Sequence, residues 1–236
     1  NSNALGTTDV ATTVLNNAAL QIQGGITVAE SNLNITGTGV SNDGALRNIS
    51  GNNIFSGTLN LTGNARVYID AGTLSMTSSG TSISMGTNTL NMGGASSGNI
   101  SVSGVVASAA SGAGALTKDG ASTSNLYLSG DNTYTGNTVV SNGVLNIQHA
   151  NSLGTTAGTT SISSGAALEI QGGITMAAEA ISVSSTGISS TTGGIRSISG
   201  NNTIPGIVTV AAASRINVDQ DALTLNNATS AIVLNS

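Results

Sequence analysis

Short stretches in which apolar and small polar residues alternate recur along the whole chain. Each contains two apolar residues separated by one position, as in Leu20/Ile22, Leu59/Leu61 and Leu145/Ile147. This period of two predicts short β-strands with one buried face, and the Gly, Asn and Ser residues between the stretches predict turns. Helical spacing is sustained nowhere, so we expect an all-β fold.

The spacing of these stretches, about 7 to 14 residues, fits either an antiparallel sandwich or a parallel β-solenoid. Two-residue hairpin signals are scarce, and Asn142-Gly143 is the clearest of them. A solenoid also accommodates a long internal duplication more readily than a closed sandwich does. We therefore favour the solenoid.

A duplication links the two halves of the chain. Residues 19–27 return at 167–175 with one substitution in nine, a displacement of 148 residues. Residues 3–8 return at 151–156, and 47–53 return at 196–202 with a displacement of 149. Long-period self-similarity is the signature of stacked repeats.

The duplication predicts a single continuous solenoid over residues 1–236, with copies at 3–149 and 151–236. The second copy is incomplete and stops opposite about Thr87. Coils of roughly 20 to 25 residues give about ten coils and a rod on the order of 50 Å long. Neither end shows a charged or helical cap, so we expect a window of a longer array whose ends stack on neighbouring repeats or on another copy.

Composition excludes several classes of function. Only 6% of residues are charged and the formal net charge is -5, which gives no basic surface for nucleic acid or anionic membranes. The chain has no cysteine, so disulfides, thiolate metal sites and cysteine nucleophiles are absent. No apolar run reaches the roughly 18 residues of a membrane helix, and we expect no membrane insertion by this segment.

Residues 116–147 carry a more specific pattern, LTKDGASTSNLYLSGDNTYTGNTVVSNGVLNI. This stretch resembles the autotransporter-associated β-strand repeat of bacterial surface proteins, although residues 122–125 depart from the usual Gly-Thr. The resemblance implies a right-handed parallel β-helix passenger that is exported and displayed outside the cell. The matching residues are Leu116, Thr117, Lys118, Leu126, Leu128, Ser129, Gly130, the run 132–136, Thr138, Val140, Gly143, Leu145 and Ile147.

Residues of this stretch have predictable structural roles. We expect Tyr134 to fill a corner, and Asn132 to bond its own backbone in a turn or to join an Asn ladder. The glycines at positions 130, 136 and 143 are expected to adopt positive φ at corners. The inward positions are expected to be Leu126, Leu128, Val140, Leu145 and Ile147.

Acidic residues are the first candidates for chemistry, because solenoid enzymes that cleave polysaccharides use clustered carboxylates. Only Asp219 and Asp221 alternate closely, and half of that pair is missing from copy one, where Asp70 and Gly72 correspond. A solvated turn is the favoured interpretation. The ten acids are Asp9, Glu30, Asp43, Asp70, Asp119, Asp131, Glu169, Glu179, Asp219 and Asp221.

Charges that recur between the copies suggest a role in stacking. Arg47 recurs as Arg196, Arg66 as Arg215 and Glu30, within a residue, as Glu179. We expect a surface pair between Arg66 and Asp70, worth about 0 to 1 kcal/mol. A binding site repeated along a fibre is the functional alternative.

Other catalytic and metal patterns are missing. His149 is the only histidine, it corresponds to Asn1, and no GxSxG motif accompanies it. The calcium nonapeptide is absent, and the pairs Gly24-Gly25 and Gly172-Gly173 precede no predicted helix that could cradle phosphate. We therefore predict no catalytic, cofactor-binding or metal-binding residue and no cofactor.

The sequence favours a non-enzymatic, extracellular structural solenoid, a segment of a bacterial cell-surface or filament protein that gives length, rigidity and contact. An adhesin that binds glycans or other cells through a polar face is the alternative, and a polysaccharide lyase or hydrolase is a third. The expected partners are neighbouring repeats or a second copy, end to end, or a glycan or cell surface.

Overall fold

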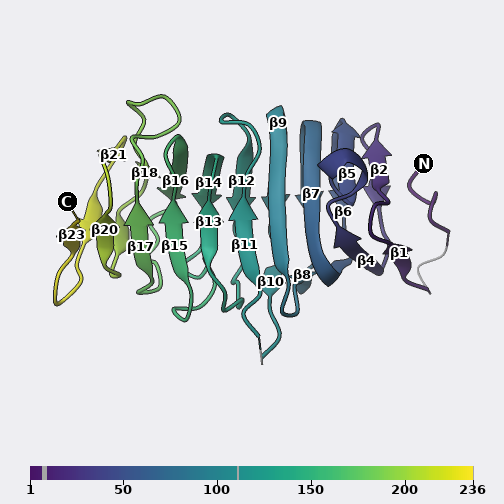
Figure 1. The fold of residues 1–236 in the computed structure, drawn as a ribbon, viewed down its shortest axis with the longest axis horizontal. Helices are drawn as coiled ribbons and strands as arrows, with labels where there is room; N and C mark the ends of the chain where they lie inside the picture. Colours follow the sequence, from purple (N-terminus) through teal and green to yellow (C-terminus); the bar gives the residue numbers. More distant parts are fainter. Residues whose placement is uncertain (7–9, 111, 236) are drawn as a thin grey trace.

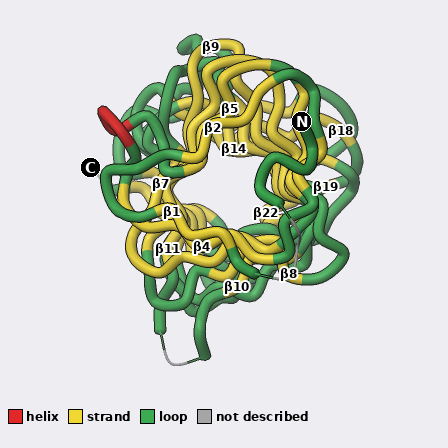
Figure 2. The backbone as a smooth tube through the Cα atoms, turned by 90° about the vertical axis from the view of Figure 1, so that its right-hand side faces the viewer, coloured by secondary structure: helices red, strands yellow, loops and turns green. Residues whose placement is uncertain are grey.

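The computed structural model describes residues 1–6, 10–110 and 112–235. Its strands lie side by side along one axis, with the N-terminus at one end and the C-terminus at the other (Figure 1). Every strand pairing within this described part of the chain is parallel. Viewed down the axis, successive coils superpose around a shared interior (Figure 2). The fold is the all-β parallel solenoid that the alternation predicts.

Each turn of the solenoid contributes one segment to each of three faces, which the chain visits in the order C, A, B. Face A is a continuous parallel ladder from one end of the rod to the other. Its strands are β2 (Leu20–Gln23), β5 (Leu46–Ser50), the middle of β7 (Thr58–Met76), the first part of β9 (Thr89–Val102), β11 (Ala115–Lys118), β13 (Thr138–Val140), β15 (Thr159–Ile162), β17 (Ala180–Val183), β20 (Val208–Val210) and β23 (Ile232–Leu234).

Face B is the second parallel ladder, and it includes the ends of β7 and β9 because these two long strands bend around a corner. Its other strands are β3 (Thr27–Val28), β6 (Asn52–Phe55), β12 (Asn125–Leu128), β14 (Gly143–Ile147), β16 (Ala166–Gln171), β18 (Ile195–Ser199) and β21 (Ile216–Val218).

Face C is less regular. Between β10 and β19 its segments at 132–135, 150–155 and 174–177 are not assigned as strands, yet backbone hydrogen bonds link them to their neighbours. A 3-10 turn, η1 (Val40–Asn42), leads from this face to face A. The strands of face C are β1 (Thr12–Val14), β4 (Asn32–Gly37), the start of β7, β8 (Thr81–Ser84), β10 (Val105–Ala107), β19 (Asn202–Ile204) and β22 (Leu223–Leu225).

The solenoid makes nine turns between β2 and β23, close to the ten coils expected. At about 4.8 Å per turn these nine turns span roughly 43 Å. Inward Leu, Ile and Val side chains form one core along the axis, and those of the inner turns are covered by the turns on either side. The predicted inward residues of the motif are all buried: Leu126, Leu128, Val140, Leu145 and Ile147.

The two sequence copies lie on different faces. Strands β2 and β5 belong to face A, whereas their counterparts β16 and β18 belong to face B. Six turns separate β2 from β15 on face A, and β16 follows β15 on the next face. The duplicated unit therefore spans about six and one-third turns, so copy two is rotated by one face.

The expectation of positive φ at corners holds for one of the three motif glycines and fails for the other two. Gly143 has φ 74°, as predicted for a corner, but Gly130 and Gly136 do not have positive φ. The prediction is wrong for these two because their requirement is space: a Cβ atom on either would overlap a backbone carbonyl, of Gly104 or Gly114, in the preceding turn. They allow neighbouring turns to approach closely.

Candidate functional surface

An ion-pair cluster lies on the outside of face A in copy one. Arg47 on β5 places Nη1 2.9 Å from Oδ2 of Asp43 and Nη2 2.8 Å from Oδ2 of Asp70. Asp70 lies one turn further along the rod, just beyond Ile69 in the β7 segment that pairs with β5. The hydrogen bond to Asp70 is the main reason that the pKa of Arg47 is raised. The cluster ties adjacent turns together.

Copy two repeats this cluster on face B. Arg196 on β18 places Nη1 2.9 Å from Oε1 of Glu169 and Nη2 2.6 Å from Oδ2 of Asp219. The hydrogen bond from Arg196 also lowers the pKa of Asp219. The three residues belong to three successive turns, so one guanidinium links all of them.

The predicted pair between Arg66 and Asp70 is wrong. Arg66 instead pairs with Asp119 at 2.9 Å, two turns further along the rod, and its guanidinium carbon lies 5.0 Å from the ring centroid of Tyr68. The long arginine side chain reaches over the Gly93 position, where no side chain blocks its path. Spacing within one strand could not reveal a partner 53 residues away.

Asp219 and Asp221 make different interactions and do not form a carboxylate pair. Asp219 holds Arg196, whereas Asp221 has φ 61° and accepts a hydrogen bond of 2.7 Å from the backbone N–H of Gly200. Gly72, the counterpart of Asp221, also has positive φ, at 78°. The conformation is that of a turn, in agreement with the favoured interpretation.

His149 forms a local turn. Its Nδ1 accepts a hydrogen bond of 3.2 Å from the N–H of Asn151 and lies 3.9 Å from the carboxylate of Asp131. The hydroxyl of Ser152 accepts from the His149 N–H and donates to the carbonyl of Leu128, so it does not face the imidazole nitrogens. This geometry does not assemble a Ser-His-Asp triad.

A buried polar chain begins in the motif and continues into the next two turns. Tyr134 is fully buried, as expected for a corner plug, and its hydroxyl lies 2.7 Å from the hydroxyl of Thr138. Thr138 stacks on Thr160, which donates a hydrogen bond of 2.9 Å to Glu179. Burial raises the pKa of Glu179 to about 7 and also raises that of Tyr134.

Asn132 has a different role from either one predicted. It is buried, its side-chain oxygen accepts from the N–H of Val106 at 2.8 Å, and its amide nitrogen donates to the carbonyl of Ser152 at 2.7 Å. It therefore joins the preceding turn to the following one. Face C needs this link because its backbone is not a regular strand at this position.

The motif contains a buried cation that was not predicted from the sequence. Lys118 is 1% exposed at an inward position, stacked between Met92 and Val140. Its Nζ donates to the carbonyls of Asp119 and Asn142 and to the hydroxyl of Ser124, which gives each of its three protons an acceptor. Burial lowers its pKa to about 8. The alternation Leu-x-Lys after Ala115 was the available signal.

A polar stripe follows the outer positions of face B. Tyr127, Asn146, Glu169 and Arg196 occupy successive turns in register. Asn146 donates to Glu169 at 3.1 Å and accepts from Gln148 at 3.0 Å. Asn146 is buried and its amide is used within the stripe, so the partly exposed groups that a ligand could reach are the ring of Tyr127 and the carboxylate of Glu169.

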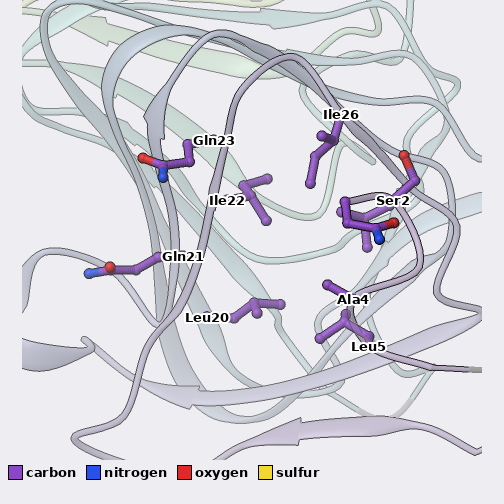
Figure 3. Close-up of a pocket in the computed structure, with 10 residues that line it drawn as sticks. Ser2, Ala4, Leu5, Leu20, Gln21, Ile22, Gln23 and Ile26 are labelled. Atoms are coloured by element: carbon purple, nitrogen blue, oxygen red, sulfur yellow. The ribbon is translucent and has the colours of Figure 1, made fainter.

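A hollow of about 170 Å³ lies at the N-terminal end of the rod. Leu20, Ile22 and Ile26 point into it, and Ala4 and Leu5 lie across it (Figure 3). It is lined mainly by apolar side chains.

Within the described residues no group of His, Asp and Glu is placed to hold a metal ion. Asp9 lies outside the described residues. No helix in the part of the chain described by the structure is long and apolar enough to cross a membrane.

The comparisons with known proteins agree with the motif. Residues 116–147 match the family model of the passenger-associated-transport-repeat. Neither a curated protein nor a solved structure matches the chain. The repeat family implies a surface or secreted protein. Residues 116–147 are thus an autotransporter passenger repeat, set within a parallel β-solenoid.

Proposed function

We propose that this solenoid is a non-enzymatic structural segment that gives length and rigidity to a passenger displayed at a bacterial surface. The observation that carries the proposal is the unbroken parallel ladder of face A over nine turns. A rod of stacked turns extends in proportion to the number of its repeats, since each repeat contacts only its neighbours.

Ties between turns support stiffness. Backbone ladders run along faces A and B, backbone hydrogen bonds link the less regular segments of face C, and side chains such as Arg47, Arg66 and Arg196 cross from one turn to another on the outside. Bending the rod would open these contacts on one side. Single exposed pairs contribute little, but the ladders and the core act along the whole length.

Small-angle scattering and electron microscopy test the rod. We expect a dilute monomer with an elongated profile, and insertion of a second copy of residues 3–149 is expected to lengthen it by about 30 Å at about 4.8 Å per turn. A compact monomer, or an inserted copy that leaves the length unchanged, would overturn the proposal.

Polysaccharide cleavage is tested separately. We expect the chain to release no product from a panel of acidic and neutral polysaccharides, because the two candidate carboxylates serve a surface ion pair and a turn. Release of oligosaccharides that Asp219→Asn or Asp221→Asn abolishes would favour the enzyme instead.

A glycan-binding surface is a second candidate, favoured by the polar stripe of face B. A sugar ring packed on the partly exposed Tyr127 would have the partly exposed carboxylate of Glu169 two turns further along the same face. On a glycan array, Tyr127→Ala is expected to remove any binding, whereas the matched variant Tyr68→Ala on face A is expected to preserve it. Equal loss in both variants, or no binding by the parent chain, counts against this surface.

A further inference from the structure

Asn142 is the one asparagine of the chain that is followed by a glycine. The Asn142-Gly143 pair lies at the corner where β13 on face A leads into β14 on face B. The backbone N–H of Gly143 donates a hydrogen bond of 2.9 Å to Oδ1 of Asn142. The backbone nitrogen therefore lies beside the side-chain amide, whose carbon Cγ carries Oδ1. A bond between that nitrogen and Cγ would close a five-membered succinimide ring.

The buried ammonium of Lys118 is directed at the same peptide group. Its Nζ donates a hydrogen bond of 3.1 Å to the backbone carbonyl of Asn142. This oxygen belongs to the peptide bond between residues 142 and 143, so it takes up negative charge when the Gly143 nitrogen loses its proton. A charged donor in a buried site stabilises such an anion. Lys118 thus makes the attacking nitrogen easier to deprotonate.

Gly143 provides the space that this arrangement needs. It has φ 74°, and a Cβ atom at this position would lie 2.5 Å from Nζ of Lys118 and 2.6 Å from the carbonyl oxygen of Ser124. A larger residue would both displace the ammonium and hinder the nitrogen. Asn142 itself is half-buried, so water reaches the corner.

We propose that Asn142 is a site of spontaneous deamidation, promoted by the Lys118 ammonium through the carbonyl of the Asn142-Gly143 peptide bond. Hydroxide removes the proton from the Gly143 nitrogen, the nitrogen bonds to Cγ of Asn142, and the Cγ–Nδ2 bond breaks to release ammonia. Water then opens the succinimide. Cleavage of the bond from nitrogen to Cγ leaves aspartate at position 142, and cleavage of the original peptide bond leaves isoaspartate.

The modification changes the environment of the buried cation. The three acceptors of Lys118 are two carbonyls and a hydroxyl, all of them neutral. Either product of deamidation adds a carboxylate at position 142, and a nearby opposite charge favours the ammonium. Since the reaction consumes only water, the added negative charge accumulates with the age of the folded chain.

The first experiment compares the folded chain with an unstructured peptide of residues 138–147, which lacks Lys118. Both are incubated at the same pH and temperature, and mass spectrometry of peptides that contain residues 142–143 measures the loss of ammonia and the later gain of water. We expect the folded chain to react about tenfold faster than the peptide. Slower reaction in the folded chain would overturn the proposal.

Variants of the same corner identify the role of the ammonium. Lys118→Met removes the charge and is expected to slow the reaction by about tenfold. Ser124→Ala is the matched control, because it removes one acceptor of Lys118 and keeps the ammonium, so it should react at the parent rate. Asn142→Gln should show no product, since the five-membered ring cannot form. A folded Lys118→Met variant that reacts like the parent would contradict the promoting role.

The dependence on pH gives a second test that needs no substitution. Burial lowers the pKa of Lys118 to about 8, while Asp119 favours its charge and Arg66 opposes it. In the folded chain we expect the rate to rise with hydroxide up to about pH 8 and then to level off as Lys118 loses its proton. The peptide should show a continuous rise. A folded chain with the same profile as the peptide would show that Lys118 does not take part.

Discussion

The two copies of the repeat fold alike on different faces. In copy one, residues 20–22 pair with residues 46–48, and the register of the pairing shifts before Gln23. In copy two, residues 168–170 pair with residues 195–197, and the register shifts at the equivalent place, before Gln171. One pair of strands lies on face A and the other on face B. The local sequence therefore specifies strand, register and corner, and the position within the cross-section does not.

The corner cluster of the repeat shows this most clearly. In copy one the buried amide of Asn53 donates to Asn48 and accepts from the N–H of Ile26. In copy two Asn202 donates to Ser197 and accepts from Ile174 in the same way. The first cluster lies where face A turns into face B, and the second where face B turns into face C. The buried amide moves with its sequence and forms the corner at its new place.

What differs between the copies is the cover provided by following turns. Leu74 is 0% exposed beneath β9, whereas its counterpart Leu223 lies on the last turn and is only partly buried. A repeat protein gains much of its stability from interfaces between neighbours. The same leucine should therefore contribute differently in the two places.

Leu74→Ala and Leu223→Ala test this contrast and should give the largest effects. Removing the inner leucine is expected to cost about 2 to 5 kcal/mol in the free energy of unfolding, and removing the outer one less than about 1 kcal/mol, because no closed cavity is left at the end. Denaturant unfolding combined with hydrogen exchange of each strand measures both values. Equal losses would contradict the expectation that cover by the following turn sets the contribution of this leucine.

Glu179 predicts a dependence on pH. Its folded pKa is raised from 4.5 to about 7 by burial, so the folded state holds a proton that the unfolded state releases. The stability from this proton is full below about pH 4.5 and is lost as pH rises through 7, with an upper limit on the order of 3 kcal/mol.

Unfolding measured between pH 4 and 8 is expected to show this slope, and Glu179→Gln should flatten it because the amide stays neutral. The groups around this carboxyl are Thr160, its hydrogen-bond donor, and Tyr134. Asp219→Asn is the control with the opposite sign, since the pKa of Asp219 is lowered and its contribution is lost only as the pH falls through the acid range. A Glu179→Gln variant that keeps the parent slope would assign the dependence to another group.

Removing the buried corner amide should lower the free energy of unfolding by the same amount in both copies. Asn53→Ala and Asn202→Ala each leave buried polar groups without partners, and we expect each to lose about 1 to 3 kcal/mol. Thermal and denaturant unfolding of the two variants compares them directly. If the losses in unfolding free energy of the two variants differ by more than one hydrogen bond contributes, the face on which the corner lies also affects its stability.

The sequence predicted the solenoid because alternation and duplication are local and repeated signals. The burial of Leu126 was predicted from the alternation, and that of Tyr134 from its expected place at a corner of the motif. It did not predict the partner of Arg66, because the contact crosses two turns, or the link made by Asn132, because that depends on an irregular face. The sequence also did not reveal that the duplicated unit spans a whole number of turns plus one-third, because the number of residues per turn varies with the loops at each corner.

The smallest effects concern the outer ion pairs, where the copies differ in one partner. Arg47 takes its second carboxylate from Asp43 in the same turn, and Arg196 takes it from Glu169 in the preceding turn, whereas Asp70 and Asp219 are common to both arrangements. Double-mutant cycles of the common Arg–Asp pairs should give couplings of about 0.2 to 1 kcal/mol that shrink in salt. If the two couplings agree, the duplication retains the Arg–Asp link between turns independently of face and of the third group. A coupling found only for Arg196 would instead indicate that the stabilisation requires an arginine bonded to carboxylates in both the preceding and the following turn.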